Sequence, residues 1–174
     1  MFSTMQRWHC SESGDPMEYI IRKMAPAEYP QFNDFLYYAI YVPEGIAPPP
    51  YEIIRQPELQ VYTQNFGSEP HDRALIAEAG GRIVGAVWVR IMEDYGHIDD
   101  ETPSFAISLL PEYRAKGIGT ALMRTMLAEL QAAGYRHASL SVQKANYAER
   151  MYRRLGFRII GETEEEYLMR YDFL

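Results

Sequence analysis

The chain has 174 residues, of which 47% are hydrophobic and 24% are charged, and its net charge is −7. These values are typical of one soluble globular domain and exclude disordered and collagen-like chains. Because the charge is negative and no lysine or arginine tract occurs, nucleic-acid binding is not expected. A single cysteine, Cys10, excludes an internal disulfide framework and a cysteine-based zinc cluster.

The start of the chain has no hydrophobic signal-peptide centre, and no apolar run approaches the ~18 residues of a membrane span. We therefore expect a cytoplasmic protein that does not bind a membrane. A strand-like run begins directly after Met17. The sequence thus predicts a flexible N-terminal extension, residues 1–16, followed by a single domain, residues 17–174.

The segment from 18 to 66 predicts a strand followed by helices. Glu18–Met24 has the composition of a short strand, and Ala25–Tyr41 carries apolar residues at helical spacing. Several prolines between Pro43 and Pro50 interrupt regular structure. After them, Tyr51–Phe66 is expected to form one or two short helices.

The segment from 73 to 134 predicts the centre of a sheet. Arg73–Ala79 and Arg82–Met92 are apolar runs on either side of two glycines, which is the sequence form of a β-hairpin. A third strand, Ser104–Leu110, follows. The clearest helix is Gly117–Ala133, which has an apolar residue at every third or fourth position and Gly134 after its end.

The last part of the chain adds strands and one more helix. The expected elements are the strand His137–Val142, the helix Asn146–Leu155 and the strands Phe157–Gly161 and Tyr167–Phe173. The complete order implies an α/β (α+β) fold, in which helices pack on both faces of a mixed sheet.

Gly117 and Gly119 stand at the entrance of the clearest helix, where glycine is costly by about 0.5–1 kcal/mol against alanine. A helix start carries unpaired N–H groups and the positive end of the dipole, so it is a site for an anion that approaches the backbone. The dinucleotide fingerprint needs glycine or alanine where this chain has Leu122, and no P-loop sequence occurs. Both nucleotide-binding folds are therefore excluded.

The segment ISLLPEYRAKGIGTALM resembles the signature of the GNAT superfamily of N-acetyltransferases, in which Q/R-x-x-G-x-G/A follows a strand end of the form V/L-x-P. NYAERMYRRLGF is similar to the second family signature, N-x-A-x-x-x-Y-x-x-x-G-F. The resemblance covers residues 18–174. It implies the GNAT fold, a central mixed, mostly antiparallel sheet of about seven strands with a V-shaped splay between strands 4 and 5, flanked by about four helices.

The resemblance implies acetyl-CoA as the cosubstrate, held in the splay, and no metal. The strand end, namely Ile107, Ser108 and Leu109, would pair with the pantetheine arm. The N–H groups that would wrap the diphosphate belong to Ala115, Lys116, Gly117, Ile118, Gly119 and Thr120. The two glycines would let the diphosphate approach these donors. Arg114 and Lys116 would add local positive charge to a chain of net charge −7.

The same resemblance makes the N–H of Leu109 the oxyanion donor and Tyr152 the general acid for the coenzyme A thiolate. A phenol near pKa 10 is a weaker acid than a thiol near 8.5, so Tyr152 can act by donating a hydrogen bond. The alternative is a tyrosine that only packs. For the base, the candidates are Glu101, then Asp100 and Asp99, or a water path to solvent. These three acidic residues also suit a solvated turn.

The acidic segment around Glu93 and Asp94 favours a cationic amine as the acceptor. Asn146 is expected either to cap the helix that it precedes or to contact the cofactor. Aromatic residues near the proline-rich break either line the acceptor site or pack in the core; they are Phe35, Tyr37, Tyr38, Tyr41 and Tyr51. The histidines have no metal-ligand spacing.

The sequence therefore predicts an acyltransferase, an acetyl-CoA-dependent N-acetyltransferase that acts on a small-molecule or peptide amine by direct transfer in a ternary complex. Two alternatives remain open. One is a transferase for a longer acyl group, and the other is a non-catalytic module that binds or senses acyl-CoA. Many relatives in the family pair, so a homodimer is compatible with the resemblance.

Overall fold

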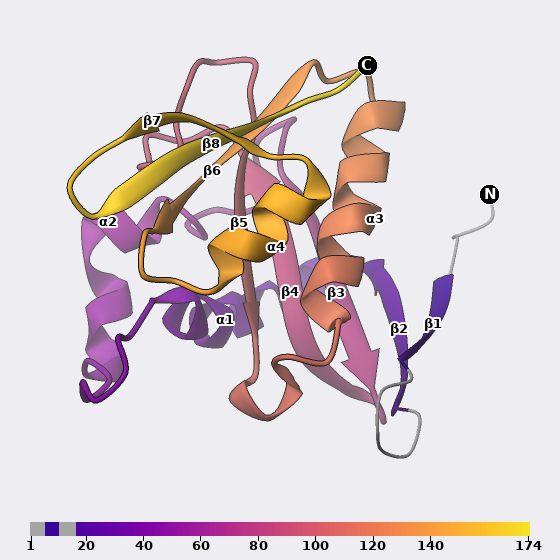
Figure 1. Ribbon diagram of the computed structural model, residues 1–174. Helices are drawn as coiled ribbons and strands as arrows, with labels where there is room; N and C mark the ends of the chain where they lie inside the picture. The colour runs from indigo at the N-terminus through magenta and orange to yellow at the C-terminus, as the bar shows by residue number, and fades with distance from the viewer. Residues whose placement is uncertain (1–5, 11–16) are drawn as a thin grey trace.

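The computed structural model describes residues 6–10 and 17–174, which form one eight-stranded sheet with helices on both faces (Figure 1). The strand order is β1-β2-β3-β4-β5-β6-β8-β7, and all neighbours are antiparallel except β5 and β6. The strands are β1 (Gln6–Cys10), β2 (Met17–Lys23), β3 (Arg73–Ala79), β4 (Arg82–Arg90), β5 (Ser104–Leu109), β6 (His137–Gln143), β7 (Arg158–Glu162) and β8 (Glu166–Asp172).

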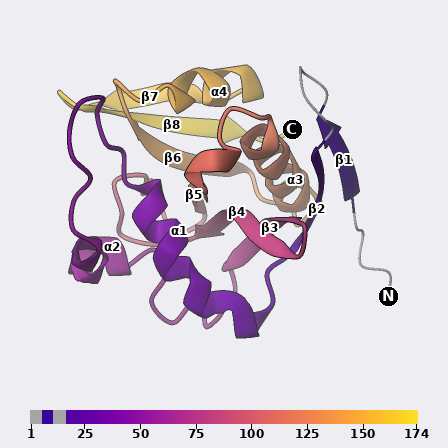
Figure 2. The same cartoon turned by 90° about the horizontal axis from the view of Figure 1, so that it is seen from below.

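Four α-helices and three short 3-10 helices connect the strands. The α-helices are α1 (Phe32–Ala39), α2 (Pro57–Gln60), α3 (Ile118–Ala132) and α4 (Ala148–Leu155), and the 3-10 helices are Pro26–Gln31, Tyr51–Arg55 and Pro111–Tyr113. Figure 2 shows α1 and α2 on one side of the sheet and α3 and α4 on the other. The predicted mixed, mostly antiparallel sheet with four helices is confirmed.

The expected N-terminal extension, residues 1–16, lies outside the described residues except for Gln6–Cys10. Those five residues form β1, which pairs with β2 so that Cys10 lies opposite Met17. The seven other strands all come from residues 17–174. β1 therefore extends the edge of the expected sheet by one strand.

The predicted helix over residues 25–41 is wrong in its extent. The segment begins as the 3-10 helix Pro26–Gln31, and only Phe32–Ala39 is α-helical. Pro30 is the reason, because proline lacks the N–H that an α-helix needs and disfavours the helical conformation of the residue before it.

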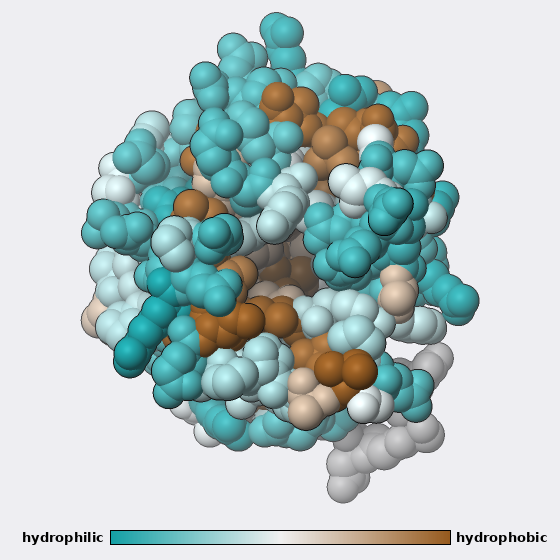
Figure 3. Space-filling model, turned by 90° about the vertical axis from the view of Figure 1, so that its left-hand side faces the viewer, coloured by the Kyte–Doolittle hydropathy of each residue, from teal (hydrophilic) through white to brown (hydrophobic). Residues whose placement is uncertain are grey.

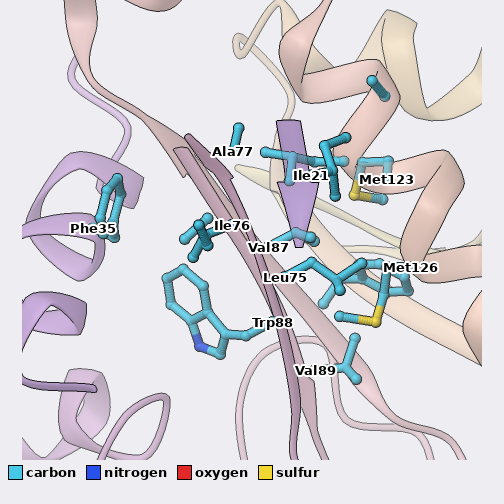
Figure 4. Packing of buried hydrophobic residues seen from close by; sticks show 14 of the residues in the cluster. Ile21, Phe35, Leu75, Ile76, Ala77, Val87, Trp88, Val89, Met123 and Met126 are labelled. Carbon is cyan, nitrogen blue, oxygen red and sulfur yellow. The ribbon is translucent and has the colours of Figure 1, made fainter. Parts of the chain in front are cut away.

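The hydrophobic core has two layers, one on each face of the sheet (Figure 4). Ile76 and Trp88 point toward α1, where they approach Phe35. On the other side, Met123 and Met126 of α3 lie against the opposite face of the same strands. Because both faces are covered, β4 is buried along nearly its whole length, which explains its continuous apolar sequence.

The sheet is open between β5 and β6, which run parallel and pair only at Ser104 and Ser139. The N–H of Ser139 donates to the carbonyl of Pro103 at 3.0 Å. Beyond this pair the two strands diverge (Figure 1). These strands are the fourth and fifth of residues 17–174, so the predicted splay is confirmed, and we call the Ser104–Ser139 pair its apex.

Candidate functional site

Backbone groups of β5 face the splay without a strand partner. The N–H of Leu110 donates to the carbonyl of Val84 at 2.9 Å, and β4 and β5 are antiparallel. In such a pair, alternate residues direct both backbone groups to the same neighbour. Even-numbered residues of β5 therefore bond to β4, and odd-numbered residues face β6. Since β6 pairs only at the apex, Ile107 and the N–H of Leu109 present free backbone groups to the splay.

Ser108, which lies between these two residues, is not brought to the splay. Its side chain is buried, and its hydroxyl donates to the carbonyl of Phe35 in α1 at 2.6 Å. Ser108 therefore fastens α1 to β5 on the opposite face, which differs from its expected contact with the pantetheine arm.

The loop before α3 has the conformation of an anion-binding site. Ala115 and Gly117 both adopt positive φ angles, 58° and 82°, and left-handed residues in such a loop turn N–H groups toward one side. The first hydrogen bond into α3 runs from Ala121 N–H to the Gly117 carbonyl at 3.1 Å. The N–H groups of residues 118–120 therefore have no acceptor within the helix and are available to a ligand.

Gly119 has a different role from the one expected. A Cβ there would stand 3.3 Å from Leu109 Cδ1, 3.8 Å from Met151 Sδ and 3.9 Å from Ile107 Cδ1. The space that Gly119 leaves is thus filled by protein, and the glycine lets α3 pack close to β5 and α4. Gly117 is the exposed member of the pair, and its left-handed conformation is the one that glycine adopts without strain.

The two basic residues of the loop are placed differently. Arg114 donates from Nη2 to the carbonyl of Tyr38 at 3.1 Å and from Nε to that of Leu109 at 3.3 Å. It therefore ties the end of α1 to the end of β5. Lys116 is exposed, with Nζ 5.7 Å from the centre of the Tyr113 ring. Both cations lie near the start of α3.

Tyr152 of α4 is 8% exposed, and its hydroxyl makes no hydrogen bond to a described residue. Burial raises the pKa of Tyr152 above its ordinary value, so the phenol is neutral at physiological pH and can donate a hydrogen bond. Its ring centre lies 6.0 Å from that of Phe157, which lies 5.9 Å from that of Phe105 in β5. This series of rings connects Tyr152 to β5 next to the apex.

The loop between β6 and α4 holds Asn146, whose Oδ1 accepts the Ala148 N–H at 2.9 Å. The expected capping contact with the first turn is therefore present. The neighbouring Ala145 carbonyl accepts a hydrogen bond of 3.1 Å from the hydroxyl of Tyr41, which follows α1. Since α1 packs on β5, this bond connects the two sides of the splay.

The three expected bases lie in the loop before β5, and all of them are exposed. The N–H of Glu101 donates to Asp99 Oδ1 at 2.9 Å, and this bond holds the pKa of Asp99 below its usual range. Asp100 lies between them. The structure groups Glu101 with this turn and not with the free backbone groups of the splay.

Asp94 is the carboxylate that the structure brings to the apex. Its Oδ2 accepts a hydrogen bond of 2.8 Å from the hydroxyl of Ser104, and Tyr62 lies near enough for the charge of Asp94 to raise the pKa of the phenol. Its Oδ1 is shielded from solvent and has no partner among the described residues. Burial raises the pKa of Asp94. Gly96 leaves room for this arrangement, because a Cβ there would collide with Ser104 Oγ.

One side of the molecular surface is hollowed. Figure 3 shows the side of the molecule that carries α2 and the turn between β7 and β8, with a depression at its centre and hydrophobic atoms inside it. No group of three or more His, Cys, Asp or Glu side chains in residues 6–10 and 17–174 is placed to hold a metal ion. Within the same ranges, no helix has the length and apolar character that crossing a membrane requires.

The chain is similar to curated acetyltransferases over part of its length. It is 32% identical over 109 residues to N-acetyltransferase family 8 member 7 of Mus musculus, which covers 62% of this chain and 48% of the relative. It is 30% identical over 90 residues to mycothiol acetyltransferase of Pseudarthrobacter chlorophenolicus, and this match covers 51% of this chain and 28% of that relative. The chain thus spans half or less of the length of these relatives.

Solved structures share the fold. The PaiA N-acetyltransferase of Thermoplasma acidophilum in complex with coenzyme A has a TM-score of 0.67 at 18% identity, over 90% of this chain and all of that one. A GNAT family acetyltransferase of Brucella melitensis in complex with acetyl-CoA has a TM-score of 0.58 at 23% identity, and the match covers 90% of this chain and 88% of that one. The profile of the acetyltransferase (GNAT) family matches residues 38–157. The chain therefore belongs to the GNAT acetyltransferase family.

Proposed function

We propose that the protein transfers an acetyl group from acetyl-CoA to a primary amine of a small molecule or peptide, by direct transfer in a ternary complex. The observation that supports this proposal is one continuous set of free backbone groups. It begins with Ile107 and Leu109 in the splay and continues with the N–H groups of residues 118–120. Amide groups of a pantetheine arm can pair with the first part, and a diphosphate suits the second.

Acetyl-CoA supplies an acyl group activated as a thioester. The N–H of Leu109 is the oxyanion donor implied by the family resemblance, and the N–H of Ile107 faces the same side, one step closer to the apex. A well-placed donor of this kind contributes about 2.7–4 kcal/mol to the transition state. Tyr152 donates a hydrogen bond to the departing sulfur.

Replacing Gly117 by alanine is expected to weaken coenzyme A binding about 10- to 100-fold, because a hydrogen bond to a charged group contributes about 1.5–3 kcal/mol. The added methyl group disfavours φ = 82° and displaces the N–H donors at the start of α3. The measurement is the thermal shift and titration calorimetry of the variant with coenzyme A.

Gly134 provides a matched control, because it lies at the other end of α3 with φ = 83° and open space around its Cα. Gly134→Ala carries a similar conformational cost and should bind coenzyme A like the unaltered protein. Equal binding by both variants would contradict the anion site, and no stabilisation of the unaltered protein by coenzyme A would contradict the proposed function.

Tyr152→Phe is expected to lower kcat about 10- to 100-fold, because it removes a hydrogen bond of about 1.5–3 kcal/mol to the thiolate. The melting temperature should change little, since the hydroxyl has no partner in the described structure. Thiol release with saturating amine measures the effect. A fully active variant would contradict the hydrogen bond to the thiolate and would show that Tyr152 only packs against Phe157.

Two alternatives predict other results in the same thiol assay. A non-catalytic acyl-CoA module would be stabilised by coenzyme A but would release no thiol with any amine. A transferase for longer acyl groups would release thiol faster from a longer acyl-CoA than from acetyl-CoA.

A further inference from the structure

The apex of the splay carries a half-buried acidic group on the face of the sheet opposite α3 and α4. Even-numbered side chains of β5 point to the α1 face, as the bond between Ser108 and the Phe35 carbonyl shows. Ser104 belongs to the same set, and its hydroxyl bonds to Asp94. Asp94 and Tyr152 therefore approach the apex from opposite faces of the sheet.

The other side of the splay contributes a second carboxylate on this face. The Ser139 hydroxyl donates to the carbonyl of Gly96, which places odd-numbered side chains of β6 on the Asp94 side. Gln143 is one of these, and its amide donates to Glu166 Oε1 at 3.0 Å. Burial and the charges of Glu165 and Asp94 raise the pKa of Glu166.

Tyr62 lies near both carboxylates. Burial raises the pKa of Tyr62, and the nearby charges of Asp94 and Glu166 raise it further. Its backbone is fixed from the sheet, because the Trp88 indole donates to the Tyr62 carbonyl at 3.0 Å. The phenol is therefore held at a defined place.

The negative charge of this group has no counter-charge in the described part of the chain, where no ion pair includes Asp94 or Glu166. Asp94 Oδ1 is shielded from solvent and lacks a hydrogen-bond partner among the described residues, which is unfavourable for a carboxylate without a cationic partner. A ligand that brings a positive charge and several N–H donors would remove both deficits. A primary ammonium group has these properties.

We propose that Asp94, Tyr62 and Glu166 bind the ammonium group of the acceptor, and that Asp94 accepts its first proton. This inference rests on the proposed function and names the acceptor as a primary amine that is protonated in solution. The acidic group is suitably placed to act on the amine, because the apex lies between it and the face of the sheet that carries Tyr152.

The transfer moves two protons from the nitrogen and exchanges a C–S bond for a C–N bond. One proton moves from the ammonium nitrogen to Asp94, which leaves a neutral amine. The nitrogen then forms the new C–N bond, and the C–S bond of the thioester breaks. The second proton of the nitrogen ends on the coenzyme A sulfur, and Asp94 returns its proton to solvent. The products are the acetylated amine, free thiol and one proton.

Asp94→Asn tests the proposal, because the amide keeps an acceptor oxygen for Ser104 but cannot take the proton. We expect kcat/KM for the amine to fall about 10²–10⁴-fold, the usual contribution of general-base catalysis. The unaltered enzyme must have Asp94 ionised, so its rate should fall as pH drops through the raised pKa. In the Asp94→Asn variant, the pH–rate profile should lose this decrease at the pKa of Asp94. Its rate should instead rise with pH up to the pKa of the amine.

Glu93→Gln is the matched control, because it removes the same charge one residue away. The Glu93 side chain is 89% exposed, and its one ion pair is a 3.8 Å contact with His97. This variant should keep the activity and the pH profile. A profile that is unchanged in Asp94→Asn would overturn the proposal, and a loss seen in Glu101→Gln instead would assign the base to the exposed turn.

A binding measurement separates this inference from the proposed function. With coenzyme A bound, spermidine, tyramine and glycine amide are titrated calorimetrically into the unaltered protein, Asp94→Asn and Glu166→Gln. We expect amine affinity to fall about 10-fold or more in both variants while coenzyme A affinity is unchanged. Amine binding that is equal in all three proteins would refute the ammonium site, whether or not any amine is acetylated.

Discussion

Replacement of Arg90 by methionine is expected to lower the free energy of unfolding by about 3–5 kcal/mol, because it leaves a buried carboxylate without its counter-charge. Arg90 donates to both oxygens of Asp72 at 3.1 Å, and these side chains are 7% and 0% exposed. Its Nη1 also donates to the carbonyls of Val61 at 3.1 Å and Gln64 at 2.9 Å. One guanidinium thus fixes the segment after α2 against β4.

Arg82→Met is the control for this prediction, since Arg82 begins the same strand. It pairs with Glu112 at 3.3 Å, but the two side chains are 62% and 56% exposed, so the pair should contribute no more than about 1 kcal/mol. Urea denaturation of the two variants measures the difference. A loss in Arg90→Met that is as small as the one in Arg82→Met would show that solvent reaches Asp72.

Trp88→Ala is expected to destabilise the protein by a similar amount, about 3–5 kcal/mol, because it opens a large cavity beside the sheet. Trp88 has no exposed surface, and its ring centre lies 5.0 Å from that of Phe32. The substitution also leaves the Tyr62 carbonyl without the indole donor. Urea denaturation measures the stability, and near-ultraviolet circular dichroism reports the loss of packing.

Trp88→Phe distinguishes the two contributions of the indole. It keeps most of the packing against Phe32 but loses the bond to the Tyr62 carbonyl. The loss of stability should therefore be smaller than in Trp88→Ala. Because Tyr62 is then less firmly held, the KM for the amine should rise while coenzyme A affinity stays constant. An unchanged KM would show that other contacts suffice to position Tyr62.

The sequence predicts the cofactor side of the site better than the acceptor side, and the reason is the distance along the chain over which each is built. The strand β5, the loop with Gly117 and the helix α3 follow one another within residues 104–132, so local patterns describe them. The group around Asp94 joins residues 62, 94 and 166, and nothing in the local sequence marks their burial. Composition indicated only that the region is acidic.

Strand pairing and helix packing give Ser108 and Gly119 surroundings that the local sequence does not show. From the sequence, Ser108 lies between two residues that face the splay, and only the pairing with β4 shows that its backbone and side chain point elsewhere. Gly119 belongs to a glycine pair that indicated close approach of a ligand. The space left by its missing Cβ is filled by Leu109, a contact that depends on how α3 packs on the sheet, while its N–H has no acceptor within the helix.

The single bridge at Ser104–Ser139 has a mechanical consequence. Among the described residues it is the one place where the strands β1 to β5 pair with the strands β6 to β8, so the sheet is divided there. Side-chain packing and the hydrogen bond from Tyr41 to the Ala145 carbonyl also connect the two parts of the sheet. An extended molecule seated there acts as the missing strand of a continuous sheet. Its binding would add backbone hydrogen bonds along the divided part of the sheet, so the two parts should unfold more nearly as one unit.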